Sequence, residues 1–427
     1  ATRNGVDMPW RAEAAYGHIG LDLTGPNGGV VRIDDIQIDD ISNVFLGEAI
    51  GVVDVRDYGA LGNGSADDHA AFEAADAAAN GREVLIPEGT YFLGDSVTME
   101  NRCRFIGTVT MAAQHYLTLV QNFNLPDYVK AFGDGELAFK KAFQSMFKGP
   151  NNVDLDMGGM KVDQREPVDM QAAVPDVTEF ANRRVISNGQ LSVVSGPNWD
   201  TEVYTSQATY TPSNPFTLTG VQNVANIPVG SLVEGNGVGR EIYVRSKNVG
   251  QQTIELSLPL YDASGTQNYT FRRFKYMLDF SGFDRITRFS LINMELLCRD
   301  DCNGIILPPT GIGFHLRDCW ITNPRERGIT SHGTGCQGMM IDRCQFATAQ
   351  GPTPSQNRTV IGCNLNANDV KLRNNRCRFF RHFAVIGGTS SIISGNHIFQ
   401  GDGGAVGPRL AAIVIAVGNS RATIEGS

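Results

Sequence analysis

The pattern of hydrophobic and polar positions is most regular near the C-terminus, where five short segments share one order. They are LINMEL (291–296), LRDCWI (316–321), IDRCQF (341–346), NNRCRF (374–379) and SGNHIF (394–399). Because side chains alternate between the faces of a strand, the fourth and sixth residues of each segment face inward and the fifth faces outward. The fourth residues are Met294, Cys319, Cys344, Cys377 and His397, and the sixth are Leu296, Ile321, Phe346, Phe379 and Phe399. We therefore predict stacked strands with a sulfur-rich column beside an apolar one.

The spacing of these segments predicts repeated coils. Successive fourth residues lie 25, 25, 33 and 20 positions apart, so one coil carries an insertion and one is short. The third residues are expected at a bend in each coil; they are Asn293, Asp318, Arg343, Arg376 and Asn396. Asn and Asp tolerate a left-handed backbone at such a bend, whereas the two arginines do not favour it.

A second pattern opens the chain at DYGALGNGSADDHAAF, residues 57–72. Asp67 or Asp68 can cap a short helix whose small apolar face is formed by Ala70, Ala71, Phe72, Ala74 and Ala75. A buried strand, VLIP (84–87), follows. Residues 133–170 repeat the turn, helix and strand without the acidic cluster. The cluster is therefore interpreted as a cap rather than a catalytic group.

The remaining segments divide the chain into four parts. Residues 1–50 form a leader, 51–190 hold the two copies of the opening pattern, and 276–427 hold the regular coils. Residues 191–275 interrupt the rhythm with alternating strands and hairpin glycines, which indicates an inserted β-rich module.

Composition narrows the possible functions. Glycine accounts for 48 of the 427 residues, which favours many tight turns, and the net charge of −9 argues against a nucleic-acid-binding protein. No apolar run is long enough to span a membrane, and the start lacks the apolar stretch of a secretory signal, so synthesis in a cytosol is expected. The eight cysteines show no metal-site spacing, and we expect no metal and no cofactor.

The opening motif, with VLIPEGTYFLG after it, resembles the N-terminal signature of the pectate-lyase-like superfamily. The resemblance implies an all-β fold, a right-handed parallel β-helix, shared by polysaccharide lyases, polygalacturonases and phage tailspikes. In tailspike-like proteins it further implies a homotrimer whose leader attaches to other virion proteins. The motif specifies the fold and not the activity, because it forms the entrance of the β-helix.

A hydrolase site is one hypothesis for the chemistry. Asp300-Asp301-Cys302 is similar to the Asp-Asp-Cys of polygalacturonases, with Asp279 before it and His332 after it in a similar order. Glycoside hydrolysis needs two carboxyl groups. The surrounding residues depart from the family pattern: Asp279 lies in LDF, His332 follows a serine, and the family's Arg-Ile-Lys motif is absent. An exposed turn is the alternative explanation.

Glycan binding is the second hypothesis. The segment KLRNNRCRFFRHF (371–383) could hold an anionic glycan, or serve a lyase, through Lys371, Arg373, Arg376, Arg378, Arg381 and His382. A solvated face or subunit salt bridges would also explain these charges. Trp320, which faces outward, could be a sugar platform or an oligomer contact. Trp199, Tyr204, Tyr210 and Phe216 could stack on sugars or fill the core of the module.

Three functions follow from these observations. The first is a virion-surface spike of a phage or phage-like particle that binds host-surface polysaccharide. The second is a polysaccharide depolymerase, a hydrolase or lyase, on the same β-helix. The third is a structural virion component. The sequence favours binding.

Overall fold

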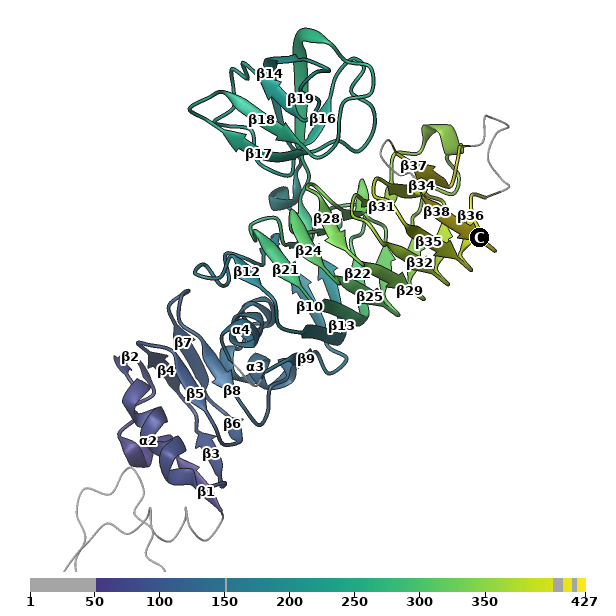
Figure 1. The fold of residues 1–427 in the computed structure, drawn as a ribbon. Coiled ribbons are helices and arrows are strands. Elements are labelled where there is room, and N and C mark those ends of the chain that lie inside the picture. Colours follow the sequence, from purple (N-terminus) through teal and green to yellow (C-terminus); the bar gives the residue numbers. More distant parts are fainter. Residues whose placement is uncertain (1–50, 150–151, 402–409, 417–420) are drawn as a thin grey trace, which may run out of the picture.

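The computed structural model describes residues 51–149, 152–401, 410–416 and 421–427. The predicted leader, residues 1–50, lies outside this set. The described chain forms an elongated stack of strands that runs from the N-terminal coils at one end to strand β38 at the other, and a separate module projects from its side (Figure 1). None of the helices in these ranges has the length and hydrophobicity to cross a bilayer.

The N-terminal coils form three small parallel sheets. The first holds β1 (Val52–Asp54), β3 (Glu83–Ile86) and β6 (Cys103–Phe105); the second holds β2 (Asn63–Asp67), β4 (Thr90–Leu93) and β7 (Thr108–Met111); the third holds β5 (Val97–Met99) and β8 (Leu117–Leu119). Helix α2 (His69–Ala79) covers their open end (Figure 1). The predicted helix and the strand at 84–87 are thus confirmed.

The acidic cluster serves the entrance structurally, as predicted, but its two acids have different roles. Asp67 Oδ1 accepts hydrogen bonds from the backbone N–H groups of His69 and Gly94, at 3.0 and 2.9 Å. Asp68 is buried and accepts from the backbone of Leu61 and Gly62, so it holds the preceding turn rather than the helix. The predicted apolar face needs a correction: Ala70 and Ala74 are exposed, and Asp76 and Ala79 complete the buried face.

The second copy of the pattern begins with two helices, α3 (Leu125–Phe132) and α4 (Gly135–Lys148), of which the first was not predicted. Asp134 caps α4 by accepting from the Leu137 N–H at 2.9 Å. Phe139, Phe143 and Phe147 of α4 are buried in the core. Four short strands follow: β9 (Asp154–Asp156), β10 (Lys161–Gln164), β11 (Val168–Asp169) and β12 (Glu179–Phe180).

Three parallel sheets then form the main β-helix. We call them sheet 1, sheet 2 and sheet 3. Sheet 1 holds β9, β10, β13 (Arg184–Val193), β22 (Phe289–Leu297), β25 (His315–Arg317), β26 (Trp320–Thr322), β29 (Met340–Asp342), β30 (Gln345–Ala347), β32 (Lys371–Arg373), β33 (Arg376–Arg378), β35 (Ser391–Ser394), β36 (His397–Phe399) and β38 (Ala422–Glu425). Sheet 2 holds β11, β20 (Tyr276–Asp279), β23 (Asn303–Ile306), β27 (Arg327–Thr330), β31 (Ile361–Leu365), β34 (His382–Ile386) and β37 (Ile413–Ile415). Sheet 3 holds β12, β21 (Arg285–Thr287), β24 (Thr310–Ile312) and β28 (Gly335–Gln337). The fold class predicted from the sequence, an all-β protein built on a parallel β-helix, is confirmed.

The predicted stacking is right for three coils and shifted in the last two. Leu296 pairs with Ile321, and Ile321 with Phe346, as expected. Phe346 then pairs with Cys377, which pairs with Ile398. The steps are therefore 31 and 21 residues, and Phe379 and Phe399 lie outside the core column. The error arose because the sequence alignment matched cysteine to cysteine, whereas the inserted loop is two residues shorter than that match requires.

In the last two coils, Asn375 and Asn396 occupy the inward positions that we predicted for Cys377 and His397. The Cys344 N–H donates to Asn375 Oδ1 at 2.9 Å, and the Asn375 N–H donates to Asn396 Oδ1 at 3.1 Å. All eight cysteines are buried free thiols, which confirms the prediction of thiols in the core.

The bend of sheet 1 requires a left-handed residue at each level. Asn188, Asn293, Asp318, Arg343, Asn374 and Gly395 have φ between 52° and 64°. Asn293, Asp318 and Arg343 were predicted, whereas Arg376 and Asn396 were misplaced by the same alignment error. Arg343 is held in this conformation by Asp318 of the coil before it, whose carboxylate accepts two hydrogen bonds from the guanidinium at 2.7 and 2.8 Å.

The projecting module is an antiparallel sheet with its own core. Its strands are β14 (Glu202–Tyr210), β15 (Thr217–Thr219), β16 (Leu232–Glu234), β17 (Val244–Asn248), β18 (Thr253–Leu256) and β19 (Gly265–Arg273), in the order β16-β19-β14-β15-β18-β17. Leu218, Ile254, Tyr269 and Phe271 are wholly buried between its strands.

Replacing an inward residue of the stack should destabilise the fold. Ile321→Ala removes a wholly buried side chain between Leu296 and Phe346, so we expect the free energy of unfolding to fall by about 2–5 kcal/mol. Urea denaturation measures the change. Ile392→Ala, on an exposed position of the same sheet, is the matched control and should change it by less than about 1 kcal/mol. Equal losses in the two variants would contradict the predicted core column.

Candidate functional site

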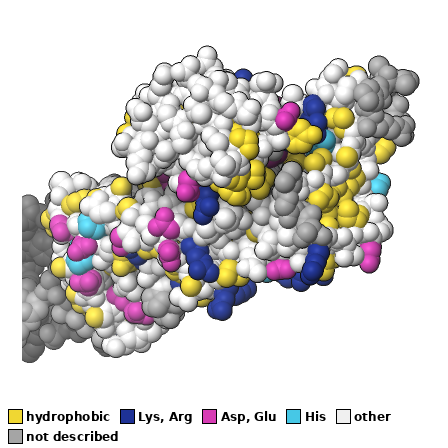
Figure 2. All heavy atoms as spheres, turned by 45° about the horizontal axis from the view of Figure 1, so that its top comes forward, with side chains coloured by type: hydrophobic (Ala, Val, Ile, Leu, Met, Phe, Trp, Pro, Cys, Tyr) yellow, Lys and Arg dark blue, Asp and Glu magenta, His cyan; other side chains and the backbone are white. Residues whose placement is uncertain are grey.

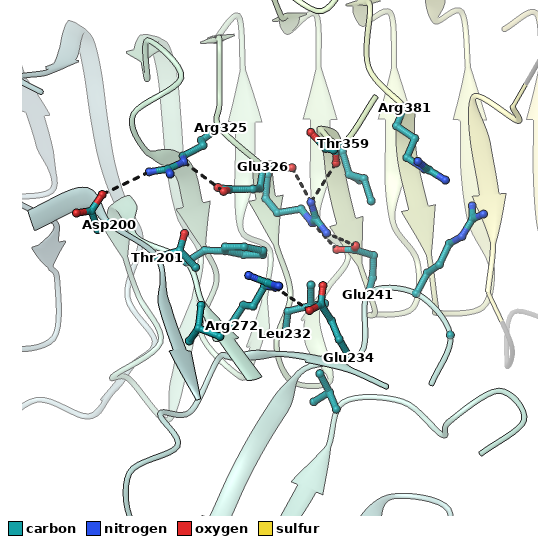
Figure 3. A pocket seen from close by; sticks show the side chains of 17 residues that line it. Asp200, Thr201, Leu232, Glu234, Glu241, Arg272, Arg325, Glu326, Thr359 and Arg381 are labelled. Carbon is teal, nitrogen blue, oxygen red and sulfur yellow. Dashed lines mark hydrogen bonds and ion pairs between the residues drawn. The ribbon is translucent and has the colours of Figure 1, made fainter. Parts of the chain in front are cut away.

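A cleft of about 870 Å³ lies between the module and sheet 2 (Figure 3). The module contributes residues from β16, β19 and the loop after β16, and the β-helix contributes residues around β27, β31 and the start of β34. In the space-filling view, hydrophobic, basic and acidic side chains lie together beneath the module, where it meets the β-helix (Figure 2). Such a concave surface with convergent polar groups is a candidate binding site.

One buried ion pair joins the module to the β-helix at the floor of this cleft. Arg327 donates from Nε and Nη2 to the two carboxylate oxygens of Glu241, at 2.9 and 2.7 Å. Both residues are buried, and the Tyr243 hydroxyl donates to the same carboxylate at 2.7 Å. Burial alone would lower the pKa of Arg327, but the charge of Glu241 raises it. Arg327 therefore stays charged, and its two hydrogen bonds to Glu241 tie the module to the β-helix at the floor of the cleft.

Glu326 is an acidic residue of the cleft next to this pair in the chain, and its pKa differs from that of an exposed glutamate. Burial raises the pKa of Glu326 above its usual value, against the opposing effects of the Asn303 hydrogen bond and the nearby arginines. Asn303 donates to Glu326 Oε2 at 3.1 Å, and Arg325 lies 3.4 Å from Oε1. A carboxyl group of this kind can hold a proton or accept a hydrogen bond from a bound hydroxyl.

The structure separates Asp279 from the turn that holds Asp300 and Asp301, whereas those two acids are neighbours in the chain. Asp279 lies opposite Ile306, at the end of the strand pair β20–β23, while Asp301 precedes Asn303 at the start of that pair. Three strand steps separate these ends by about 10 Å, more than the roughly 5–9.5 Å between paired carboxyl groups of glycosidases.

Two of the three predicted acids, Asp279 and Asp301, are also engaged in structural contacts. Asp279 is ion-paired with Arg273 and accepts a hydrogen bond from the Ser281 N–H at 2.9 Å. Burial would raise the pKa of Asp279, but Arg273 and Ser281 hold it below its usual value. Asp300 and Asp301 lie in an exposed turn, the predicted alternative, where Ser195 donates to Asp301 at 2.6 Å. Burial, and next the charge of Asp301, raise the pKa of Asp300.

His332 is wholly buried and therefore has no access to a substrate on the surface. Burial lowers its pKa to about 4, and the positive charge of Arg273 acts in the same direction. The imidazole is thus neutral at ordinary pH. Its place near Asp279 and Arg273 is structural.

Trp320 lies on the outer face of sheet 1, as predicted, with 51% of its surface exposed. Its column on that face runs through Gln190, Glu295, Trp320, Gln345, Arg376 and His397. At about 4.8 Å between strands, the column extends roughly 24 Å. Glu295 is oriented by a hydrogen bond from Gln190 at 2.6 Å.

The predicted basic segment is divided between two faces. Lys371, Arg373 and Arg378 lie on sheet 1, where Arg373 is paired with buried Asp342 at 3.3 Å. Arg381 lines the cleft on the other side of the β-helix, and the adjacent His382 is buried beside it. The two sets therefore cannot form one anion-binding cluster.

The predicted aromatic platform of the module is contradicted at Trp199. Its ring is 2% exposed and packs in the main core, and its Nε1–H donates to the Val194 carbonyl at 3.0 Å. Tyr204 is partly buried against the module core and donates to Glu202 at 3.0 Å. Tyr210 is buried, so of the four rings Phe216 alone is exposed.

Sequence reasoning missed Glu241, Glu326 and Arg327. Glu241 and Glu326 lie in loops and Arg327 is the first residue of β27, and the Glu241–Arg327 pair joins positions 86 residues apart. The one local signal is the charged run NPRERG (323–328) between two apolar strands.

Comparison with known proteins agrees with this architecture. The fold is that of a parallel β-helix protein. The sequence profile of the family described as rhamnogalacturonase A/epimerase, pectate lyase-like, matches residues 52–257. Together, the fold and the match confirm the resemblance to the pectate-lyase-like β-helix superfamily. No curated protein matches the chain.

Several solved structures are similar at low identity. The surface adhesin PfbA of Streptococcus pneumoniae is 13% identical over 81% of this chain and 61% of that chain, with a TM-score of 0.25. A mutant tailspike protein of E. coli bacteriophage HK620, in complex with a hexasaccharide, is 11% identical over 89% of this chain and 57% of that one, with a TM-score of 0.28. An endo-xylogalacturonan hydrolase from Aspergillus tubingensis is 11% identical over 87% and 95%, with a TM-score of 0.24. This chain thus spans 61% of the adhesin's length and 57% of the tailspike's.

Removing one partner of the buried ion pair should destabilise the protein strongly. Arg327→Ala leaves Glu241 buried without its counter-charge, and we expect a loss of about 3–5 kcal/mol in the free energy of unfolding. Urea denaturation is the measurement. Arg272→Ala breaks the exposed pair with Glu234 in the same cleft and should cost less than about 1 kcal/mol. A loss no larger for Arg327→Ala than for this control would show that the pair does not hold the module.

The buried histidine should make stability depend on pH. Because the pKa of His332 is lower in the folded chain, its contribution is complete above about pH 6.5 and is lost as the pH falls toward 4. Between about pH 7.5 and pH 5 the loss should be roughly 2 kcal/mol. His332→Gln should weaken this dependence, measured by denaturation at both pH values. His397→Gln, on an exposed position, should leave it unchanged. Identical pH dependence in the wild type and His332→Gln would refute the assignment.

Proposed function

We propose that this chain binds a host-surface polysaccharide as part of a virion-surface spike, along the outer face of sheet 1. In this proposal residues 1–50 attach the spike to other virion proteins and three copies of the chain associate. The virion role and the trimer rest on the sequence resemblance to tailspike-type β-helices. The binding role rests on the structure of one face.

The observation that carries the binding proposal is the exposed ring of Trp320 in the middle of a straight polar column. The exposed indole of Trp320 has a flat face that can cover the C–H surface of a sugar ring. Glu295 and Gln345 flank it one strand away on each side and can exchange hydrogen bonds with hydroxyl groups. Because parallel strands repeat at a constant spacing, the face suits a linear polymer.

Depolymerase activity has less support from the described residues. Asp279 lies about 10 Å along the strands from the start of β23, next to the turn that holds Asp300 and Asp301, and both Asp279 and Asp301 are held in structural contacts. Binding without cleavage is therefore the function we propose.

Truncation of the exposed tryptophan should abolish polysaccharide recognition. We expect Trp320→Ala to weaken binding to the recognised polymer at least about 10-fold, because the apolar contact with the sugar ring is lost. Biolayer interferometry against a panel of bacterial surface polysaccharides measures affinity, and labelled protein on intact bacteria tests recognition of the cell surface.

Phe216→Ala is the matched control, since Phe216 is an aromatic residue of similar exposure on the module. It should bind like the wild type. Unchanged affinity of Trp320→Ala would overturn the assignment of the face. Absence of binding to every polysaccharide and every cell would favour the purely structural role instead.

A further inference from the structure

One end of the cleft between the module and sheet 2 holds two arginines that no carboxylate neutralises. Of the basic residues lining the cleft, Arg272 pairs with Glu234, Arg325 lies near Asp200 and Glu326, and Arg327 pairs with Glu241. Arg240 and Arg381 have no ion-pair partner in the described part of the chain. Figure 3 shows Arg381 at the end of the cleft away from Asp200.

His382, which contacts Arg240 and follows Arg381 in the chain, does not neutralise either arginine. His382 Nε2 lies 2.7 Å from Arg240 Nη1, and its Nδ1 lies 2.6 Å from the Ala411 carbonyl oxygen. A guanidinium group only donates, so Nε2 accepts and Nδ1–H donates, which makes the ring neutral. Burial has the largest effect and lowers the pKa of His382, and the charges of Arg240 and Arg381 lower it further, against the Ala411 carbonyl and the charge of Glu241. The three groups thus form a cationic end of the cleft.

Both guanidinium groups keep unused donors. Arg240 contacts His382 through Nη1, and Arg381 donates through Nη1 to the carbonyls of Gln356 and Arg358, at 3.1 and 2.9 Å. Within the described residues their other nitrogens make no hydrogen bond. Each arginine therefore presents N–H groups whose fork geometry matches the oxygens of a carboxylate or phosphate.

An apolar surface lies directly beside this cationic end. Arg240 also lines a second groove of about 440 Å³, formed with Ile242, Leu258, Pro259, Tyr261 and Val385. Tyr261 is 78% exposed. A ring lying against Tyr261 would therefore place a charged substituent near Arg240, and its hydroxyl groups could reach the acceptors of the cleft.

We propose that Arg240 and Arg381 bind the oxyanion of an acidic glycan, with Tyr261 covering one sugar ring. The ligand class rests on the proposed glycan binding, but this site uses another sheet and other residues than the Trp320 face. The two like charges, held close at the interface of two separately cored parts, would be neutralised by the ligand. The module therefore has a recognition role beyond its place in the fold.

The test compares three small probes: glucuronate, glucose 6-phosphate and glucose, titrated by NMR against the full chain. We expect one or both acids to bind at least about 10-fold more tightly than glucose. Preference for glucuronate identifies a carboxylate as the natural oxyanion, and preference for glucose 6-phosphate identifies a phosphate. Affinities for both acids no higher than for glucose would overturn the proposal.

Variants locate the site. Arg240→Gln, at an exposed position, and the double variant R240Q/R381Q should lose most of the preference for acids, and Tyr261→Ala should weaken all sugar binding. The double variant R183Q/R285Q removes two exposed arginines that belong to neither proposed site and is the matched control. Arg381 donates to two loop carbonyls, so its replacement could unfold the chain. Thermal melts show whether each variant is folded. If R240Q/R381Q is unfolded, the affinity of Arg240→Gln for the acids decides whether the site is assigned correctly.

The two proposals fail separately. Trp320→Ala should leave the binding of small acids unchanged. If Trp320→Ala binds the polysaccharide like the wild type, the proposed binding face on sheet 1 is withdrawn and the cleft proposal stands. If R240Q/R381Q binds both acids like the wild type, the cleft is withdrawn and the sheet 1 face is unaffected.

Discussion

The fold depends on parallel, in-register stacking, which requires every coil to give the next one the same backbone shape. A bend at one level must recur at the next, so the bend of sheet 1 takes a left-handed residue in six coils, from Asn188 to Gly395. Where the sequence provides an arginine there, at Arg343, the carboxylate of the coil before it fixes the guanidinium. The same constraint places Leu296, Ile321, Phe346 and Cys377 in one inward column. Outward positions and loops are free of it, and they carry the candidate sites.

The inserted module changes what the stack can do. A parallel β-helix alone offers flat faces, such as the one that carries Trp320, whereas a concave site needs a second body beside it. The module provides that body, and the Glu241–Arg327 pair joins it to the first residue of β27. Because both partners are buried, the joint is costly to break, which makes the cleft a fixed feature rather than a gap between loosely linked parts. The protein thus presents a flat face and a hollow on different sheets.

Much of the fold followed from local patterns, and most of the site did not. The capped helix at 69–79, the strand at 83–86 and the first three coils were predictable because period-two alternation and turn residues act over a few positions. The last two coils were misaligned because the alignment rewarded identical cysteines, while the structure places Asn375 after Cys344 in the buried column. The polar neighbours of Trp199 suggested an exposed ring, but the structure packs this ring in the main core. The cleft depends on residues far apart in sequence, and its single local signal, the charged run at 323–328, does not indicate the contact with the module.

The backbone N–H groups of the buried column at the bend each bond to a side chain farther along the chain. The backbone N–H of Cys319 points to Cys344 Sγ at 3.4 Å, that of Cys344 to Asn375, that of Asn375 to Asn396, and that of Asn396 to Ser427 Oγ at 3.4 Å. The asparagine side chains bond in the opposite direction: Asn375 Nδ2 donates to the Ile341 carbonyl at 2.9 Å and Asn396 Nδ2 to the Leu372 carbonyl at 3.0 Å, each in the preceding coil. Removing the neighbouring coil on either side would therefore leave a buried donor without its partner. These asparagines consequently tie each of the last coils to both of its neighbours, so the stack resists separation from either end.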